Sequence, residues 1–362
     1  MPSSFKKLSK NLLLLTISVL GSLLLAEFLV RIILPQDRMI TWLEMHSEGF
    51  MMNQRKGDAM QEHNGSVINY SFTDTRLRST ESNSDSITKK VLALGDSFTF
   101  GLLLQEEDTY VHLLNEKLKE SGADSVQILN GGVGGAGLAD WPAWLEKNGS
   151  KIDADIILYF MNIHDLERAL SKNIYVFEKD SLIKSQRWKP RSFMQSLGKQ
   201  KWYRWLQGNS ELFTLVVKVL WKNVYFVDLT EGFDQDKTSV QIPKNEQLYI
   251  ESEYSLNLGI KLFEKMNDWC AKNECELIIT TTGFFPHAEE SFHTTRLYNT
   301  MIDASLAWLN KIKFYDPSTC VDAAVNSNYD SIIIPGDTHP NRKGSEVISD
   351  CSWKLLRKEL TN

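Results

Sequence analysis

From residue 87 to the end of the chain, short apolar runs alternate with stretches in which apolar residues recur every three or four positions. Short apolar runs bounded by polar residues and glycine are typical of strands buried inside a sheet. Five runs predict strands: residues 91–94, 126–129, 155–160, 276–280 and 313–316. Helices are predicted over 110–120, 256–272 and 296–310, and after residue 341. This alternation predicts an α/β domain with a parallel sheet of about five strands.

The first forty residues have a different pattern. Lysines at positions 6, 7 and 10 precede a mostly apolar segment, 12–34, which is long enough to cross a bilayer core of about 30 Å. Basic residues on that side place the N-terminus in the cytoplasm. A signal peptide cleaved after Ala26 is the alternative. Leu24 would stand at the −3 position of that cleavage site, where a small residue is usual, and apolar residues continue after Ala26. We therefore expect an uncleaved anchor.

Two charged residues interrupt the end of this apolar segment. Glu27 and Arg31 stand four positions apart, so they share one face of a helix and can pair with each other. Arg31 is also close enough to the end of the segment to extend towards the headgroups. We expect a pair that satisfies itself near the membrane surface, and a contact with a partner helix is the alternative.

The rest of the chain divides by composition. We expect a cytoplasmic tip and anchor over 1–35, a polar membrane-proximal connector over 36–86, and a catalytic domain over 87–362. Residues 166–250 form an aromatic-rich insertion in that domain, with helical spacing of its apolar residues near 212–220. Such a spacing most often belongs to a core, and a lid or a membrane-facing surface is the alternative.

Composition narrows the class of protein. The chain has 362 residues, of which 42% are hydrophobic and 24% charged, as in ordinary folded proteins. A formal net charge of −6 argues against a nucleic-acid partner. Four cysteines, at positions 270, 275, 320 and 351, lack the spacing of a zinc site. They allow one or two disulfides, and three full pairings remain open.

Candidate chemistry lies at the two ends of the predicted domain. The first strand ends in Gly95-Asp96-Ser97, which places a serine at the carboxyl end of a strand, where open α/β sheets bind their ligands. Ser97 as a simple helix cap is the alternative. Near the other end, Asp337 and His339 supply a carboxylate and a base. Together the three residues suggest a nucleophile activated by a histidine.

These motifs, Gly-Asp-Ser-Phe-Thr-Phe-Gly at 95–101 and Asp-Thr-His-Pro-Asn at 337–341, resemble those of the SGNH (GDSL-type) hydrolases, in their membrane-anchored bacterial branch. The resemblance covers about residues 70–360. It implies a flavodoxin-like three-layer α/β/α fold, with Ser97 as nucleophile and His339 as base. The family usually places the acid three residues before the histidine, where this chain has Gly336, so Asp337 or a nearby acid is expected to orient the imidazole.

The oxyanion hole is also assigned by resemblance. It implies the backbone N–H groups of Ser97 and Gly135, the latter in a glycine loop over 130–137. That loop contains a G-x-G-x-x-G pattern, but it follows the second strand and lacks the acidic residue of a dinucleotide site. The third donor is a side chain after the third strand. Alignment on Asp165 favours His164, to which we lean, and residue type favours Asn162.

The resemblance implies a serine esterase that needs no metal or organic cofactor. Its expected substrates are short acyl esters, such as acetyl esters, of carbohydrates or lipids outside the cytoplasm, in the periplasm if the cell is Gram-negative. An O-acyltransferase would use the same site, and a catalytically inactive assembly subunit of envelope polysaccharide synthesis is the rival from another class. The sequence leaves the protein partners open.

Overall fold

The computed structural model describes residues 3–78, 86–185, 197–220, 253–284, 312–325 and 328–361. The chain divides into two compact units. The anchor unit consists of Met1–Thr41, Ala59–Ile68 and Ser196–Thr238, as far as these are described. The sheet unit consists of Trp42–Asp58, Asn69–Gln195 and Ser239–Asn362. The predicted helix over 296–310 lies outside the described residues.

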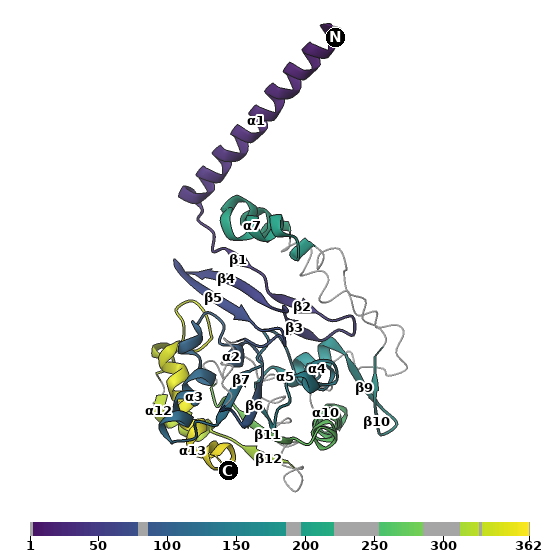
Figure 1. The fold of residues 1–362 in the computed structure, drawn as a ribbon, viewed down its shortest axis with the longest axis vertical. Helices are drawn as coiled ribbons and strands as arrows, with labels where there is room; N and C mark the ends of the chain where they lie inside the picture. The colour runs from purple at the N-terminus through teal and green to yellow at the C-terminus, as the bar shows by residue number, and fades with distance from the viewer. Residues whose placement is uncertain are drawn as a thin grey trace. The chain divides into compact units, whose positions relative to one another are not determined.

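A parallel sheet of five strands forms the centre of the sheet unit, which confirms the predicted fold class (Figure 1). The strand order is β12-β11-β8-β6-β7. Since β6 lies between β7 and β8, the chain reverses its direction across the sheet there, as in flavodoxin-like folds. The strands are β6 (Lys89–Leu94), β7 (Val126–Asn130), β8 (Ile156–Met161), β11 (Glu276–Thr281) and β12 (Lys313–Tyr315).

Alternate residues of each strand pack on opposite faces of this sheet. Leu92 and Leu94 of β6 belong to the core under one layer of helices, and Val91 and Ala93 belong to the core under the other. Both faces are therefore buried, which explains why the strands are apolar throughout. The first layer holds α4 (Asp140–Asn148), α5 (Asp165–Lys172) and α10 (Glu253–Lys272). The second holds α3 (Tyr110–Glu120), α12 (Ser318–Val325) and α13 (Arg342–Thr361).

Smaller elements complete the sheet unit. They are the antiparallel pairs β2 (Leu43–Met45) with β3 (Met51–Asn53) and β9 (Tyr175–Glu178) with β10 (Ser181–Lys184), the short helix α2 (Ser97–Phe100), and the 3-10 turns η1 (Glu106–Asp108), η2 (Gly149–Lys151) and η4 (Tyr329–Ser331).

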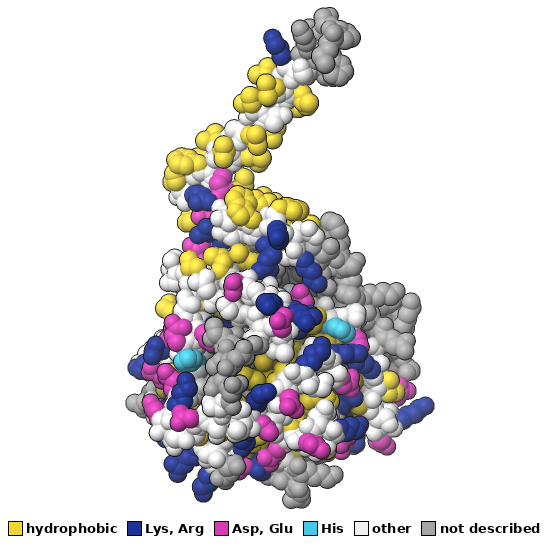
Figure 2. Space-filling model, in the orientation of Figure 1, with side chains coloured by type: hydrophobic (Ala, Val, Ile, Leu, Met, Phe, Trp, Pro, Cys, Tyr) yellow, Lys and Arg dark blue, Asp and Glu magenta, His cyan; other side chains and the backbone are white. Residues whose placement is uncertain are grey.

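The anchor unit begins with α1 (Ser3–Ile33). Its segment Ser9–Ile33 is long and apolar enough to cross a membrane, with a mean hydropathy of 2.3, and its length and position also suit a signal sequence. Figure 2 shows the hydrophobic side chains that this helix exposes. The unit also holds β1 (Met39–Ile40), α7 (Lys201–Asn209) and helical residues 211–220. Strands β4 (Gly57–His63) and β5 (Ser66–Phe72) run from one unit into the other, in a sheet of order β1-β4-β5.

One disulfide, Cys320–Cys351, joins α12 to α13, and Cys270 and Cys275 are free thiols. The sequence allowed one or two disulfides, and the structure has one between described cysteines. The cross-link ties the last helix of the domain to the layer that it packs in. Disulfides of this kind persist in oxidising compartments.

This pairing predicts an alkylation pattern. We expect iodoacetamide, added to the denatured chain without reductant, to modify Cys270 and Cys275 and to leave Cys320 and Cys351 unmodified. Peptide mass spectrometry measures all four positions. After reduction all four should react, which is the internal control. Modification of all four without reductant would contradict the disulfide.

Candidate active site

The chain turns sharply where β6 ends, and this turn presents Ser97. At Gly95 a Cβ atom would lie 2.0 Å from Thr99 Oγ1 and 2.8 Å from the carbonyl oxygen of Phe160, so only glycine fits there. Asp96 then caps α2, because its Oδ1 accepts the N–H of Phe98 at 2.9 Å. The helix cap is therefore Asp96, and the hydroxyl of Ser97 is left for another partner.

That partner is His339, which comes from the loop before α13. The distance between Ser97 Oγ and His339 Nε2 is 2.7 Å, and that between His339 Nδ1 and Asp337 Oδ1 is 2.5 Å. If Nδ1 carries the proton and donates it to the carboxylate, Nε2 accepts the hydrogen of the serine hydroxyl. The ring of Phe98 packs against the imidazole, with 4.8 Å between the ring centroids. The structure thus brings the three residues that the two motifs suggested into one hydrogen-bonded chain.

The loop that carries His339 is closed by backbone hydrogen bonds. The carbonyl of His339 accepts the N–H of Ile334 at 2.9 Å, and Asp337 donates its N–H to the carbonyl of Ile334 at 3.0 Å. Asn341, after Pro340, donates its side-chain amide to the carbonyl of Ile333 at 2.9 Å. These bonds fix the histidine before the first turn of α13.

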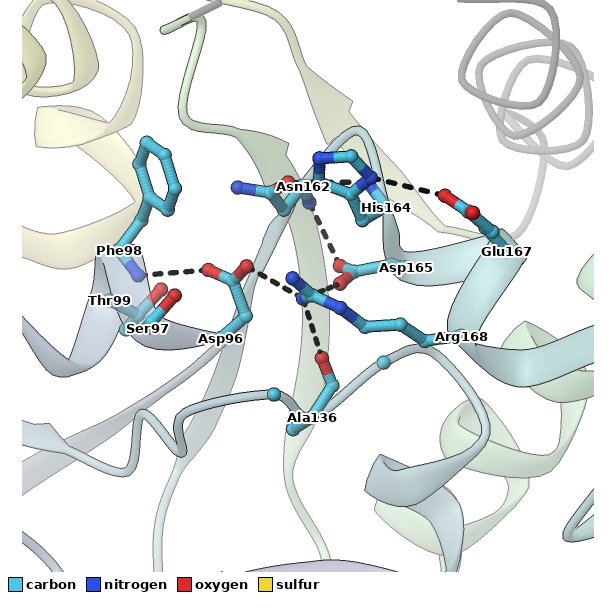
Figure 3. Close-up of polar contacts among 12 residues, drawn as sticks. Asp96, Ser97, Phe98, Thr99, Ala136, Asn162, His164, Asp165, Glu167 and Arg168 are labelled. Atoms are coloured by element: carbon cyan, nitrogen blue, oxygen red, sulfur yellow. Dashed lines mark hydrogen bonds and ion pairs between the residues drawn. The ribbon is translucent and has the colours of Figure 1, made fainter. Parts of the chain in front are cut away.

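The partly buried guanidinium of Arg168 connects the loops behind Ser97. Arg168 of α5 donates from one nitrogen, Nη1, to Asp96 Oδ2 at 2.7 Å and to the carbonyl of Ala136 at 2.9 Å (Figure 3). The same nitrogen lies 3.6 Å from Asp165 Oδ1. Asp165 also accepts the hydroxyl of Tyr159 at 2.5 Å. One cation therefore joins segments that follow β6, β7 and β8.

The charges in this network shift each other's pKa. Burial raises the pKa of Asp165 to about 7, and the carboxylate of Asp96 acts in the same direction. Burial alone would lower the pKa of Arg168, but Asp96 and Asp165 outweigh it and raise that pKa above its usual range. Arg168 therefore stays charged beside two carboxyl groups that are almost wholly buried, and its charge lowers the free energy of the ionised form of each.

A second partly buried cation, Lys172, holds the glycine loop after β7. Lys172 donates to the carbonyl of Gly135 at 2.7 Å and to both carboxylate oxygens of Asp140, at 2.9 and 2.7 Å. Gly135 has a φ of 72° and its N–H has no partner among the described residues. Gly132 packs tightly beside α2, since a Cβ there would lie 2.2 Å from the backbone nitrogen of Phe100. The loop thus leaves the Gly135 N–H available.

The two candidate side-chain donors after β8 are arranged differently. Asn162 is buried, and its Oδ1 accepts the N–H of His164 at 3.2 Å. Its amide nitrogen has no partner among the described residues and points to the side on which Ser97 lies (Figure 3). The ring of His164 instead lies 3.1 Å from Glu167 Oε2, and 45% of its side chain is exposed. The positions of the two side chains therefore favour Asn162 and do not match the preference for His164.

The sequence motifs do not point to Arg78, an arginine that is almost wholly buried. Its guanidinium donates to the carbonyls of Phe100, Gly101 and Leu104, the last two at 2.6 Å. It also lies 4.8 Å from the ring centroid of Tyr70. Among the described residues it has no carboxylate partner within ion-pair distance, and burial lowers its pKa to about 10. Arg78 therefore holds the turn that follows Ser97 through hydrogen bonds to backbone carbonyls.

In the described part of the chain, no group of three or more His, Cys, Asp or Glu side chains is arranged to hold a metal ion.

No protein-family model and no curated protein matches the chain, whereas solved structures do. LAE5, an alpha/beta hydrolase enzyme from the metagenome of Lake Arreo, Spain, is 14% identical over 76% of this chain and 97% of its own, with a TM-score of 0.42. A protein of the lipolytic G-D-S-L family from Veillonella parvula is 11% identical over 75% of this chain and 100% of its own, at 0.42. A catalytic mutant of Axe2, an acetylxylan esterase from Geobacillus stearothermophilus, is 14% identical over 75% of this chain and 94% of its own, with a TM-score of 0.42.

The structures that match thus include GDSL-type lipolytic proteins. At such identities and TM-scores, the role of each residue in this chain rests on the chain's own geometry.

The contacts of Arg78 predict a large loss of stability when it is replaced. Arg78→Met keeps the length of the side chain and removes a charged donor from the carbonyls of three buried residues. We expect the free energy of unfolding to fall by on the order of 3 kcal/mol. Urea denaturation of the detergent-solubilised chain, followed by circular dichroism, measures it. Arg55→Met is the matched control, because the side chain of Arg55 is 68% exposed, and an equal effect of both variants would contradict this role.

Proposed function

We propose that this protein is a serine esterase with Ser97 as nucleophile, His339 as general base and Asp337 as the orienting carboxylate. The observation that carries the proposal is the continuous chain of hydrogen bonds from Asp337 through His339 to the hydroxyl of Ser97. A serine is a weak nucleophile at its ordinary pKa and needs an adjacent base. A third group that holds the base in the required tautomer completes this arrangement.

In the proposed reaction, Ser97 Oγ attacks the ester carbonyl while its proton moves to His339 Nε2. The imidazolium then gives that proton to the departing alcohol oxygen as the C–O bond breaks, which leaves an acyl group on Ser97. Water attacks the acyl-enzyme in the same way, with His339 again as base, and releases the free acid and the serine. Asp337 stabilises the imidazolium in both steps and does not itself take the proton.

The negative charge on the carbonyl oxygen needs donors that are free before the substrate binds. The backbone N–H groups of Ser97 and Gly135 and the side-chain amide of Asn162 meet this condition among the described residues. The bond from Lys172 to the Gly135 carbonyl holds the peptide that directly follows this N–H. We therefore propose these three groups as the oxyanion hole and give His164 no part in it.

We further propose that the substrates are short acyl esters of glycans or lipids outside the cytoplasm. The apolar segment at the N-terminus and the disulfide support a catalytic domain that is anchored in the membrane and exposed to an oxidising compartment. The division into an anchor over 1–35, a connector over 36–86 and a catalytic domain over 87–362 belongs to this proposal. Transfer of the acyl group to a sugar hydroxyl instead of water would use the same residues.

The nucleophile is tested with an active-site probe. A fluorophosphonate should label the detergent-solubilised full chain, which should also hydrolyse p-nitrophenyl acetate, because only an activated serine reacts. Ser97→Ala should abolish both signals and His339→Ala should reduce them nearly as far, while Ser125→Ala, at an exposed loop position, should keep them. An unlabelled wild-type chain would instead favour an inactive binding subunit. Acylated sugar in place of free acid would make the protein a transferase.

The oxyanion donor is tested by two substitutions. We expect Asn162→Ala to lower kcat about a hundredfold with little change in KM, since the amide binds the charge that develops only in the transition state. His164→Ala should leave both constants near the wild-type values, because its ring faces Glu167. Steady-state kinetics with p-nitrophenyl acetate measures both. The opposite result would assign the role to His164.

A further inference from the structure

The anchor helix carries a carboxylate that is bonded to a segment far along the chain. Glu27 of α1 accepts the Ser210 hydroxyl at 2.7 Å and the backbone N–H groups of Glu211 and Leu212, both at 3.0 Å. These groups form the start of the helix over 211–220, so Glu27 serves as the acceptor for its first turn. All of these residues belong to the anchor unit.

Arg31 completes the contact on the other side of the same junction. Its Nε donates to Glu27 at 2.7 Å, and its Nη2 donates to the carbonyl of Asn209, the last residue of α7, at 2.6 Å. A cation at the carboxyl end of one helix and an anion at the amino end of the next both match the helix dipoles. The ion pair of the anchor therefore holds α7 and helix 211–220 at the point where they meet.

The position of this ion pair along α1 determines a depth in the membrane. A bilayer core of about 30 Å takes about 20 helical residues, so a core that begins at Leu12 ends near Arg31. Glu27, four residues earlier, then lies about 6 Å inside that boundary. A carboxylate there is costly unless it is paired and hydrogen-bonded, and its donors come from residues 210–212. Those residues must lie at the same depth.

The two helices expose apolar side chains next to this junction. The exposed fractions are 56% for Trp202 and 64% for Trp205, whereas Tyr203, on the other face of α7, is only 6% exposed. On helix 211–220 the exposed apolar residues are Val216, Val219 and Leu220. Figure 2 shows hydrophobic side chains along α1 and again on the surface of the anchor unit beside the lower end of that helix.

We propose that α7 and helix 211–220 form an interfacial helix pair that lies in the boundary between headgroups and acyl chains beside the anchor. The lipid bilayer covers the exposed side chains of Trp202, Trp205, Val216, Val219 and Leu220. Tryptophan is enriched at this depth, and amphipathic helices sink their apolar faces about 5–10 Å into it. The proposal depends on a membrane-embedded α1 and is independent of the esterase chemistry.

Tryptophan quenching by lipid tests this proposal. The full chain is reconstituted into vesicles of equimolar phosphatidylcholine and phosphatidylglycerol, with the phosphatidylcholine either unmodified or brominated near the top of its acyl chains. We expect brominated lipid to quench part of the emission. The double variant Trp202→Phe/Trp205→Phe should lose on the order of half of that quenching. Trp353→Phe, at a half-buried position in α13 of the sheet unit, should leave the quenched emission unchanged.

A second variant tests the contact with the anchor. Glu27→Leu makes α1 more apolar and removes the acceptor of residues 210–212, so the chain should stay in the vesicles while quenching falls. Equal quenching of the wild type and the double Trp variant, in a chain that resists carbonate extraction, would overturn the proposal. A protein partner on this face would give that result. Release by carbonate would overturn the anchor and this proposal together, and fluorophosphonate labelling, which should persist in every variant, reports separately on the proposed function.

Discussion

The contact on which the arrangement of the candidate site depends is the guanidinium of Arg168. Parallel strands bring the loops after β6, β7 and β8 to one edge of the sheet, and backbone hydrogen bonds link these loops in pairs: the N–H of Val133 donates to the carbonyl of Gly95 at 2.9 Å, and that of Leu138 to the carbonyl of Asp165 at 3.0 Å. Arg168 binds a carboxylate, a carbonyl and a second carboxylate across them. Because Asp96 and Asp165 are almost wholly buried, removal of the cation would leave the Asp96 carboxylate without its ion-pair partner and would raise the pKa of Asp165 further. Asp96 thus has two structural roles, one for each oxygen: it caps α2 and binds Arg168.

Most of the sheet unit could be predicted from the sequence because its signals are local. The helix predicted over 110–120 is observed as α3, Tyr110–Glu120, where Thr109 caps the start. The predicted strands are observed within two residues of their ends, since apolar residues on both faces mark them clearly. Arg168 and Arg78 could not be found in this way. A basic residue in a polar stretch is ordinarily exposed, and only the fold shows that carboxylates or carbonyls surround these two.

Site residues could be predicted from the sequence where the residue type alone indicates a role. They could not be predicted where the role depends on which of two nearby side chains the backbone turns towards the site. Serine and histidine in their motifs point to a candidate nucleophile and base, but the candidate donor after β8 depends on a turn of a few residues. There, Asn162 donates its N–H to Asp165 Oδ2 at 2.8 Å and accepts the N–H of His164. This turn directs the histidine ring outwards. In the motif at 337–341, Asp337 Oδ1 lies 2.5 Å from His339 Nδ1 and also accepts the backbone N–H of His339 at 2.7 Å. A carboxylate two residues before the histidine thus reaches it.

The pair of Glu27 and Arg31 shows most clearly what a sequence hides. Spacing of four residues predicts that the two charges satisfy each other, and they do pair. A carboxylate has more acceptor capacity than one arginine uses, however, and in an apolar segment the remaining capacity requires other donors. Those donors lie more than 180 residues away. The insertion is consequently divided between the two units. Its first part, with α5 and β9–β10, belongs to the sheet unit, and its described helices over 201–220 belong to the anchor unit. On the helix over 211–220, Val216, Val219 and Leu220 are exposed, whereas Leu212, Phe213 and Leu215 are half-buried. The spacing of apolar residues therefore predicted the helix but could not show which of them the protein itself covers.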